Sequence, residues 1–279
     1  MIYKRENFYS VPGCRGTMLR APTGNSQQGL FVCGYARGEP LKRKEEIDMA
    51  IADLKREGEV FILTMQGGEN RFNPSFIGEM NQALDQVEQS TGPAALVTVG
   101  GEEKFYSNGL DLGWLMGEGI KEWKNFIPEV LKFLGRVMAS PIPTVAAING
   151  HAFAAGAMLA LAHDYRVMRA DRGFFCLPEV DIKIPLAPGM RALIQSRLTP
   201  TVFRDAILTG KRIGGVEAKE LGIMDEAVPA DQVLPRAVAR AAALAGKDRR
   251  IYGNLKRGMY GEVLALLESG EADFSFMSP

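Results

Sequence analysis

The pattern of hydrophobic and polar residues predicts alternating strands and helices from Gly58 onward. Residues 59–65 (EVFILTM) are almost continuously apolar, which is typical of a buried strand. Residues 74–89 follow a turn and carry apolar side chains on one stripe, as an amphipathic helix does. A second apolar strand is predicted over residues 94–100. This order predicts crossover helices that wrap a mostly buried sheet.

The same alternation continues through the middle of the chain. Residues 121–140 predict a helix, and two prolines separate it from a strand over 144–150. Residues 152–164 (AFAAGAMLALAHD) are apolar around the whole circumference of a helix, so we expect this helix to be buried on all sides. A strand over 164–170 (DYRVMRA) follows.

After about residue 195 the pattern predicts amphipathic helices with no strand between them. We therefore expect an α/β core over residues 51–200 and a helical region over 201–279 that covers the core or a neighbouring subunit. Residues 1–50 show neither the alternation of a strand nor the apolar stripe of a helix, and they are interpreted as an extension. A targeting segment and a disordered tail remain alternatives for this extension.

Composition excludes several function classes. The 33 basic and 33 acidic residues balance, which disfavours nucleic acid or an anionic membrane as the main partner. The three cysteines lack C-x-x-C spacing and only two histidines are present, so neither a zinc site nor a disulfide framework is expected. No apolar run reaches the length of about 18 residues that a membrane span needs. Even residues 141–162 contain Asn149 and His151.

Two segments combine small residues with a strand-to-helix junction. In FYSNGLDL, Gly109 permits unusual backbone conformations and Asp111 is a good helix N-cap, so the N–H of Leu110 could point into a cleft. In NGHAFAAGAMLALAHD, Ala155 lies in the expected first helical turn, where N–H groups lack partners inside the helix. A plain Asn-Gly turn and tight helix packing are the respective structural alternatives.

Glu179, in FFCLPEVDIKIP, is the candidate acid or base. Its neighbours are mostly apolar, and partial burial would raise the pKa of its carboxyl group toward neutrality. Two converging backbone N–H groups form an oxyanion hole, and a nearby carboxylate could then remove a proton from the carbon beside a thioester. A surface glutamate on a loop is the alternative.

Four segments, in this order, resemble the enoyl-CoA hydratase/isomerase (crotonase) superfamily: FYSNGLDL, PIPTVAAINGHAFAAGAMLALAHDYRVM, RGFFCLPEVDIKI and TGKRIGGVEAKELGIMDEAVP. The resemblance covers about residues 57–260. It implies a crotonase-like ββα spiral core with C-terminal helices that assemble homotrimers or hexamers. It also implies an acyl-CoA thioester substrate and no cofactor, since coenzyme A is part of the substrate.

Residue by residue, the resemblance implies that the N–H groups of Leu110 and Ala155 form the oxyanion hole. Many members have glycine at the second position, but alanine keeps the N–H. Hydratases of the family carry two glutamates; the first falls at Met158 here, and only Glu179 remains. Ser107, Asn108, Gly109 and Met158 are the expected substrate-binding residues.

The methionine at position 158, where hydratases of the family carry a glutamate, favours isomerisation over hydration. Hydration must position a water and deliver a proton, and methionine does neither. Moving a double bond needs one base that carries a proton from C2 to C4. The chain is thus most similar to monofunctional Δ3,Δ2-enoyl-CoA isomerases of the plant type. Hydration, thioester hydrolysis, decarboxylation and a non-catalytic acyl-CoA binder or structural oligomer remain alternatives.

The remaining candidates are interpreted more conservatively. His151, His163, Asp111 and Asp181 are expected to be structural, with Asp181 the better catalytic outsider. Lys256, Arg257 and Tyr260 have the chemistry to meet a CoA nucleotide, although a solvated helix face is favoured. The family resemblance points to a peroxisome or a mitochondrion, while the chain ends in FMSP instead of an S-K-L type address.

Overall fold

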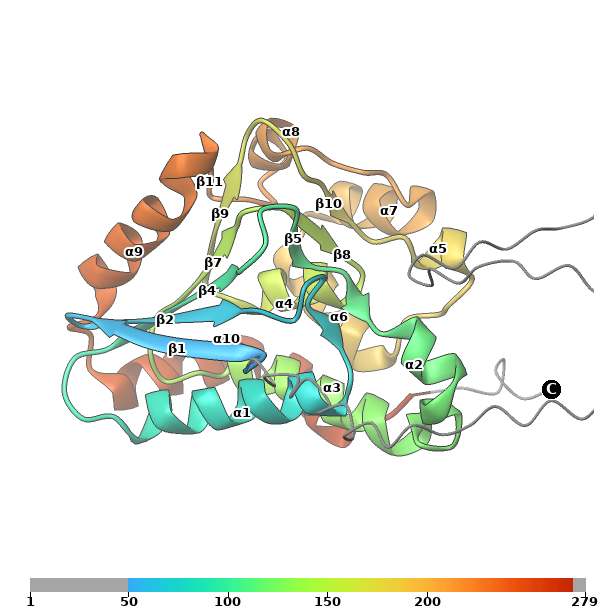
Figure 1. Ribbon diagram of the computed structural model, residues 1–279, viewed down its shortest axis with the longest axis horizontal. Helices are drawn as coiled ribbons and strands as arrows, with labels where there is room; N and C mark the ends of the chain where they lie inside the picture. The colour runs from blue at the N-terminus through green and yellow to red at the C-terminus, as the bar shows by residue number, and fades with distance from the viewer. Residues whose placement is uncertain (1–49, 273–279) are drawn as a thin grey trace, which may run out of the picture. The chain divides into compact units, whose positions relative to one another are not determined.

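The computed structural model describes residues 50–272, so the predicted extension 1–50 lies, except for Ala50, outside the described residues. The strands are β1 (Ala52–Glu57), β2 (Val60–Met65), β3 (Arg71–Phe72), β4 (Ala95–Gly100), β5 (Phe105–Ser107), β6 (Gly109–Leu110), β7 (Thr144–Ile148), β8 (His151–Phe153), β9 (Tyr165–Arg169), β10 (Phe175–Cys176) and β11 (Glu226–Val228). They form a six-stranded sheet of order β1-β2-β4-β7-β9-β11, a three-stranded sheet β10-β8-β5 and a two-stranded sheet β3-β6 (Figure 1).

Helices alternate with these strands up to the last third of the chain. The helices are α1 (Pro74–Gln89), α2 (Leu112–Met116), η1 (Glu118–Lys121), α3 (Trp123–Met138), α4 (Ala155–Ala162), α5 (Glu179–Ile182), α6 (Pro188–Arg197), α7 (Pro200–Thr209), α8 (Gly215–Glu220), η2 (Ala230–Gln232), α9 (Val233–Leu244) and α10 (Arg249–Ser269). The predicted α/β class is confirmed, and so is the helical character of most of the C-terminal third.

The large sheet is buried on both faces, as its nearly continuous apolar strands predict. In β2, Val60 and Ile62 pack in a cluster with α9, whereas Phe61 and Leu63 face the core that contains α1, α3 and α4. Adjacent strands from β2 to β11 run parallel, and only β1 pairs antiparallel with β2. Figure 1 shows α9 on one side of this sheet and α1 and α3 on the other.

Several elements were missed from the sequence, among them two strands of the large sheet and helix α6. The short strand β8 was also missed; it holds residues 152–153, which were predicted to be helical, so that the helix begins only at Ala155. The strand β1 (ADLKRE) is an edge strand whose second half is exposed, so it lacks the apolar pattern of the inner strands. The expectation of no strand after residue 195 was wrong, because β11 adds to the sheet beside β9. This strand has only three residues, all half-buried, and carries no readable period. Helix α6 was missed although its buried Met190, Leu193 and Ile194 lie on one face, because its ten residues carry only this short apolar stripe.

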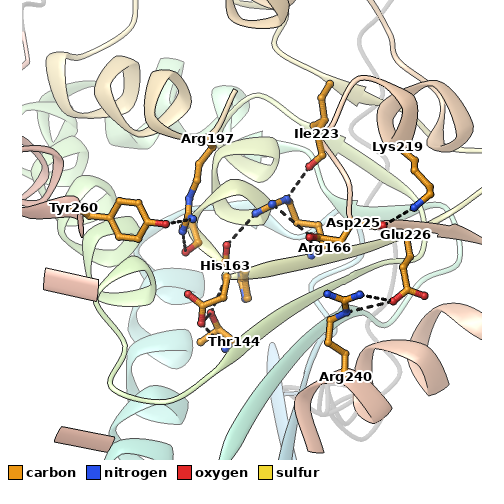
Figure 2. A network of polar contacts seen from close by, with 12 residues as sticks. Thr144, His163, Arg166, Arg197, Lys219, Ile223, Asp225, Glu226, Arg240 and Tyr260 are labelled. Atoms are coloured by element: carbon orange, nitrogen blue, oxygen red, sulfur yellow. Dashed lines mark hydrogen bonds and ion pairs between the residues drawn. The ribbon is translucent and has the colours of Figure 1, made fainter. Parts of the chain in front are cut away.

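Buried polar contacts connect the C-terminal elements to the core (Figure 2). Arg166 on β9 donates hydrogen bonds to the carbonyl oxygens of Ile223 (2.7 Å) and His163 (3.0 Å). The ammonium of Lys256 on α10 lies 2.8 Å from the carboxylate of Asp164, and Lys256 is only 4% exposed. The expectation of a solvated helix-face charge was therefore wrong for Lys256, which helps to hold α10 on the core.

Candidate active site

A cavity of about 210 Å³ is lined by residues near the start of α4, the end of β6 and the start of α5. Five of the residues singled out from sequence line it: Asn108, Leu110, Ala155, Met158 and Glu179. Segments far apart in the chain therefore meet at one place.

The strand β6 directs the N–H of Leu110 away from its neighbouring strand. Gly109 has a φ of 76°, in the left-handed region that glycine adopts without strain, as expected. The next N–H along the strand, that of Asp111, donates to the carbonyl of Phe72 on β3 at 2.9 Å. Because successive N–H groups of a strand point to opposite sides, the N–H of Leu110 points away from β3. Asp111 also caps α2 by accepting from the N–H of Trp114, which confirms its predicted capping role.

The second junction lies against the first. Ala155 is the first residue of α4, where N–H groups have no partner inside the helix. This N-terminal end also carries the partial positive charge of the helix dipole. A Cβ on Gly109 would lie 2.7 Å from the backbone nitrogen of Ala155, and a Cβ on Gly156 would overlap with the carbonyl oxygen of Ser107. The absence of a side chain at both glycines thus brings the two junctions into contact.

Backbone strain accompanies this contact. Ala154, just before α4, has a φ of 49°, which residues other than glycine rarely adopt. Its N–H donates to the carbonyl of Cys176 at 3.0 Å, which ties the junction to β10. Strain of this kind costs about 1–3 kcal/mol and clusters at functional sites.

Polar residues around Asn108 support the first junction. The hydroxyl of Ser107 donates to the carbonyl of Asn70 (2.7 Å) and accepts from the N–H of Gly109 (3.1 Å). Neither Ser107 nor Gly109 is among the described residues that line the cavity. The side-chain amide of Asn108 donates to Glu69 at 2.8 Å, and Glu69 also pairs with Arg71. These partners could not be predicted, because the sequence offers only a polar turn there.

Glu179 begins the short helix α5 and is 7% exposed. Burial raises the pKa of its carboxyl group from 4.5 to about 7, which confirms the expected direction. Its Oε2 atom has no hydrogen-bond partner among the described residues. The alternative of a surface glutamate on a loop is wrong, and a carboxylate with this pKa is suited to take up and return a proton near neutral pH.

The lining of the cavity is polar in one part and apolar in another. Arg71 and Asn108 lie on or beside the paired strands β3 and β6, whereas Ile184, Leu186 and Met190 come from α6 and the segment before it. Among the described lining residues, the sole acid is Glu179. The arrangement can hold an oxyanion on two backbone N–H groups and move a proton with one carboxylate.

The histidines take structural positions, as expected. The ring of His151 lies among the rings of Phe105, Phe153 and Phe174 and is not among the described cavity-lining residues. His163 is buried, and its Nδ1 lies 2.8 Å from the carbonyl oxygen of Leu159 at the end of α4. Burial lowers the pKa of His163 to about 4, so the ring is neutral at pH 7.

Residues 50–272 carry neither a metal-binding cluster nor a membrane-spanning helix. No cluster of three or more His, Cys, Asp or Glu side chains arranged to hold a metal occurs in this part of the chain. In the same range, every helix is too short or too polar to span a bilayer.

Comparisons with known proteins agree with the geometry. Residues 55–270 match the family model described as enoyl-CoA hydratase/isomerase. Enoyl-CoA delta isomerase 3 of Arabidopsis thaliana is 36% identical over 225 residues, which cover 77% of this chain and 94% of the relative. The same plant's enoyl-CoA delta isomerase 2, peroxisomal, is 37% identical over 226 residues, with the same coverage of 77% and 94%.

Solved structures share the fold. The apo structure of an enoyl-CoA isomerase from Mycobacterium tuberculosis has a TM-score of 0.73 at 25% identity and covers 79% of this chain and 96% of that chain. Human mitochondrial delta3-delta2-enoyl-CoA isomerase has a TM-score of 0.73 at 21% identity, with coverage of 78% and 86%. The predicted crotonase-like fold is confirmed, and this chain belongs to the enoyl-CoA hydratase/isomerase (crotonase) family.

Proposed function

We propose that the protein is a Δ3,Δ2-enoyl-CoA isomerase that shifts the double bond of unsaturated fatty acyl-CoA. The observation that carries this proposal is that one buried carboxylate, Glu179, is the sole acid among the described residues that line the cavity, and its pKa of about 7 lies in the range of a general base. Met158 stands where the family resemblance expects the first glutamate of a hydratase, and it lines the same cavity. The two Arabidopsis relatives named enoyl-CoA delta isomerases support the same reaction.

In the proposed reaction, the thioester oxygen of a 3-enoyl-CoA accepts hydrogen bonds from the N–H groups of Leu110 and Ala155. The Glu179 carboxylate takes a proton from C2, and the electron pair of that C–H bond delocalises onto the thioester oxygen as an enolate. The enolate then collapses to form the C2=C3 bond, while the electrons of the C3=C4 bond take the proton from Glu179 at C4. The carboxylate is regenerated and the product is a 2-enoyl-CoA.

Each part of this site is expected to contribute a definite factor to the reaction rate. A general base contributes about 10²- to 10⁴-fold to the rate. An oxyanion-hole donor contributes about 10²- to 10³-fold. The apolar residues beside Glu179 exclude water from the enolate, which strengthens the hydrogen bonds that hold it.

The direct test is isomerisation of trans-3-hexenoyl-CoA to 2-hexenoyl-CoA by the wild type and Glu179→Gln. We expect the variant to lose about 10²- to 10⁴-fold in kcat. The control Glu220→Gln makes the same substitution at an exposed position on α8 and should keep the wild-type rate. An unchanged rate in Glu179→Gln would refute the assignment of the base.

Product analysis separates the other reactions of this fold. The proposal expects 2-enoyl-CoA as the only product from 3-enoyl-CoA, with neither 3-hydroxyacyl-CoA nor free CoA. A hydratase would yield the hydroxyacyl product, and a thioesterase would release CoA. Tight binding of acyl-CoA without any turnover would identify a non-catalytic binder.

Three further properties belong to the same proposal. The chemistry uses no redox step, so we expect activity without an added cofactor or metal. We expect a homotrimer or hexamer, which sedimentation analysis measures. A peroxisomal location is favoured because two relatives from Arabidopsis are named peroxisomal, with the mitochondrion as alternative; fluorescent fusions at each terminus distinguish the two.

A further inference from the structure

A chain of buried hydrogen bonds runs through the core from the end of α4 to β5. The hydroxyl oxygens of Thr98 on β4 and Tyr106 on β5 lie 2.8 Å apart, and Oγ1 of Thr98 lies 3.0 Å from Nε2 of His163. The other ring nitrogen of His163, Nδ1, lies 2.8 Å from the carbonyl oxygen of Leu159. The three side chains are each at most 1% exposed, and none belongs to the described residues that line the catalytic cavity.

The protons of this chain can be placed from the chemistry of its acceptors. A carbonyl oxygen only accepts, so Nδ1 of His163 carries the proton that is donated to Leu159. Burial lowers the pKa of His163 to about 4, so the ring is neutral at pH 7 and its Nε2 is an acceptor. Thr98 therefore donates to His163, and its oxygen accepts from Tyr106. Burial raises the pKa of the Tyr106 hydroxyl, which stays protonated and serves as the first donor of the chain.

Helix α4 connects this chain to the candidate oxyanion hole. Ala155, whose N–H is one of the two expected donors, begins the helix, and His163 directly follows its last residue. The eight residues between Ala155 and Ala162 span about 12 Å. All eight are buried and none has a polar side chain, and apolar packing is not directional. The direction-specific contacts of α4 therefore lie at its two ends.

The C-terminal end of α4 is held by hydrogen bonds to its carbonyl groups (Figure 2). Arg166 donates to the carbonyl oxygen of His163 at 3.0 Å, and Arg197 donates to that of Ala162 at 3.4 Å. Cations at this end also complement the helix dipole. Among these contacts, only the ring of His163 continues through Thr98 to β5, the strand that precedes the first oxyanion junction.

We propose that Thr98 is a positioning residue for the oxyanion hole. Its hydroxyl joins the end of α4 to β5 and thereby fixes the distance between the N–H groups of Ala155 and Leu110. The glycine contact at the start of α4 limits how closely the two junctions approach, and the buried chain opposes their separation. This inference rests on the proposed function, because it takes these two N–H groups as the donors to the thioester oxygen. Misplacement of a reacting geometry by about 1 Å can cost about 10²-fold in rate.

The first test separates the hydroxyl of Thr98 from its methyl group. Thr98→Val keeps the shape of the side chain but leaves Nε2 of His163 without a donor and the hydroxyl of Tyr106 without an acceptor. We expect it to lower kcat for trans-3-hexenoyl-CoA about 10- to 10²-fold, with KM changed less than about twofold. Thr98→Ser keeps the hydroxyl and loses the methyl group, and it should recover most of the lost kcat. A role in packing alone would give the opposite order of the two variants.

Thr64→Val is the matched control. Thr64 lies on the neighbouring strand β2 of the same sheet, where it pairs with Val99, the residue after Thr98. It is half-buried, and its hydroxyl takes no part in the chain. The control should keep the wild-type kcat and KM.

A second measurement needs no turnover. Infrared spectroscopy of bound hexanoyl-CoA, with carbon-13 at the thioester carbonyl, reports how strongly the protein polarises the C=O bond. Two N–H donors lower the stretching frequency of this bond relative to the free ligand. We expect the full lowering in the wild type and Thr64→Val, nearly the same lowering in Thr98→Ser, and a smaller one in Thr98→Val.

The outcomes of the two measurements distinguish this inference from the proposed reaction. Equal carbonyl frequencies in the wild type and Thr98→Val would overturn the inference, whatever the activity of the protein. A carbonyl frequency that depends on the Thr98 hydroxyl, in a protein that does not isomerise 3-enoyl-CoA, would support the inference and refute the proposed reaction. If Thr98→Val shows no cooperative unfolding in urea, Tyr106→Phe replaces it, because that variant removes only the hydroxyl at the other end of the chain. An unchanged kcat and carbonyl frequency in Tyr106→Phe would then overturn the inference.

Discussion

Removal of the Glu179 carboxyl group should stabilise the folded protein above pH 7 while it abolishes the proposed activity. Glu179 is 7% exposed, and burial raises the pKa of its carboxyl group from 4.5 to about 7. Each pKa unit corresponds to about 1.4 kcal/mol, so ionisation of Glu179 costs about 3 kcal/mol more in the fold than in the unfolded chain.

The direction of this change in stability follows from the number of protons that the folded and the unfolded chain bind. Between pH 4.5 and about 7, the folded protein keeps a proton on Glu179 that the unfolded chain has lost. The free energy of unfolding of the wild type therefore carries a contribution that falls as pH rises through this window. Glu179→Gln has no such proton, so we expect its advantage over the wild type to grow from near zero at pH 4.5 to about 3 kcal/mol above pH 7.

Urea unfolding of both proteins from about pH 4.5 to pH 8 measures this difference directly. Protein concentration must be held constant, because assembly of subunits would add to the apparent stability. Other titrating groups act in both proteins and cancel in the difference. The control Glu220→Gln should differ from the wild type by less than about 0.5 kcal/mol at every pH. A difference for Glu179→Gln that stays flat across the window would refute the claim that burial opposes ionisation of this carboxyl group.

Three further predictions concern the base, the oxyanion junction and the anchoring of α10. The kcat/KM for 3-enoyl-CoA should rise with pH and level off above an apparent pKa of about 7, because the base is the ionised form of Glu179; a flat profile between about pH 6 and pH 8 would contradict this. Gly109→Ala should lower kcat about 10²- to 10³-fold, because its Cβ would lie 2.7 Å from the backbone nitrogen of Ala155. The control Gly92→Ala has a similar φ of 75° but open space around it, so it should carry similar backbone strain and keep the wild-type kcat. Lys256→Met should cost about 3–5 kcal/mol in urea unfolding, because the carboxylate of Asp164 stays buried without its cation, and a loss below about 1 kcal/mol would refute this role for the pair.

The inner strands and the long helices could be predicted because the strands are continuous apolar runs and the helices carry apolar residues at helical spacing. Strands β2, β4, β7 and β9 are runs of five or six residues, mostly buried, and α1 has six buried side chains spaced along one face. The strands β1 and β11 could not be predicted, because an exposed edge and a length of three residues leave no apolar pattern. Their assignment depends on pairing with β2 and β9, which only the folded chain supplies.

The candidate site was predictable in its parts but not in its arrangement. The glycine at position 109 and the small residues around Ala155 indicate backbone exposure, and the apolar neighbours of Glu179 indicate burial. That these segments meet depends on the contact of Gly109 with the start of α4, which no local pattern encodes. The link from Asn108 to Glu69 escaped prediction for the same reason, since a glutamate in a polar turn has many possible partners.

The central claim is that Glu179 alone carries one proton from C2 to C4 of the substrate. The most direct measurement uses 3-enoyl-CoA with deuterium in both C2 positions, a single turnover by the wild-type protein and mass analysis of the 2-enoyl product. Because the Glu179 carboxyl group is buried, we predict that a measurable share of the deuterium removed from C2 appears at C4. Complete replacement by solvent hydrogen at C4 would contradict the single-glutamate shuttle.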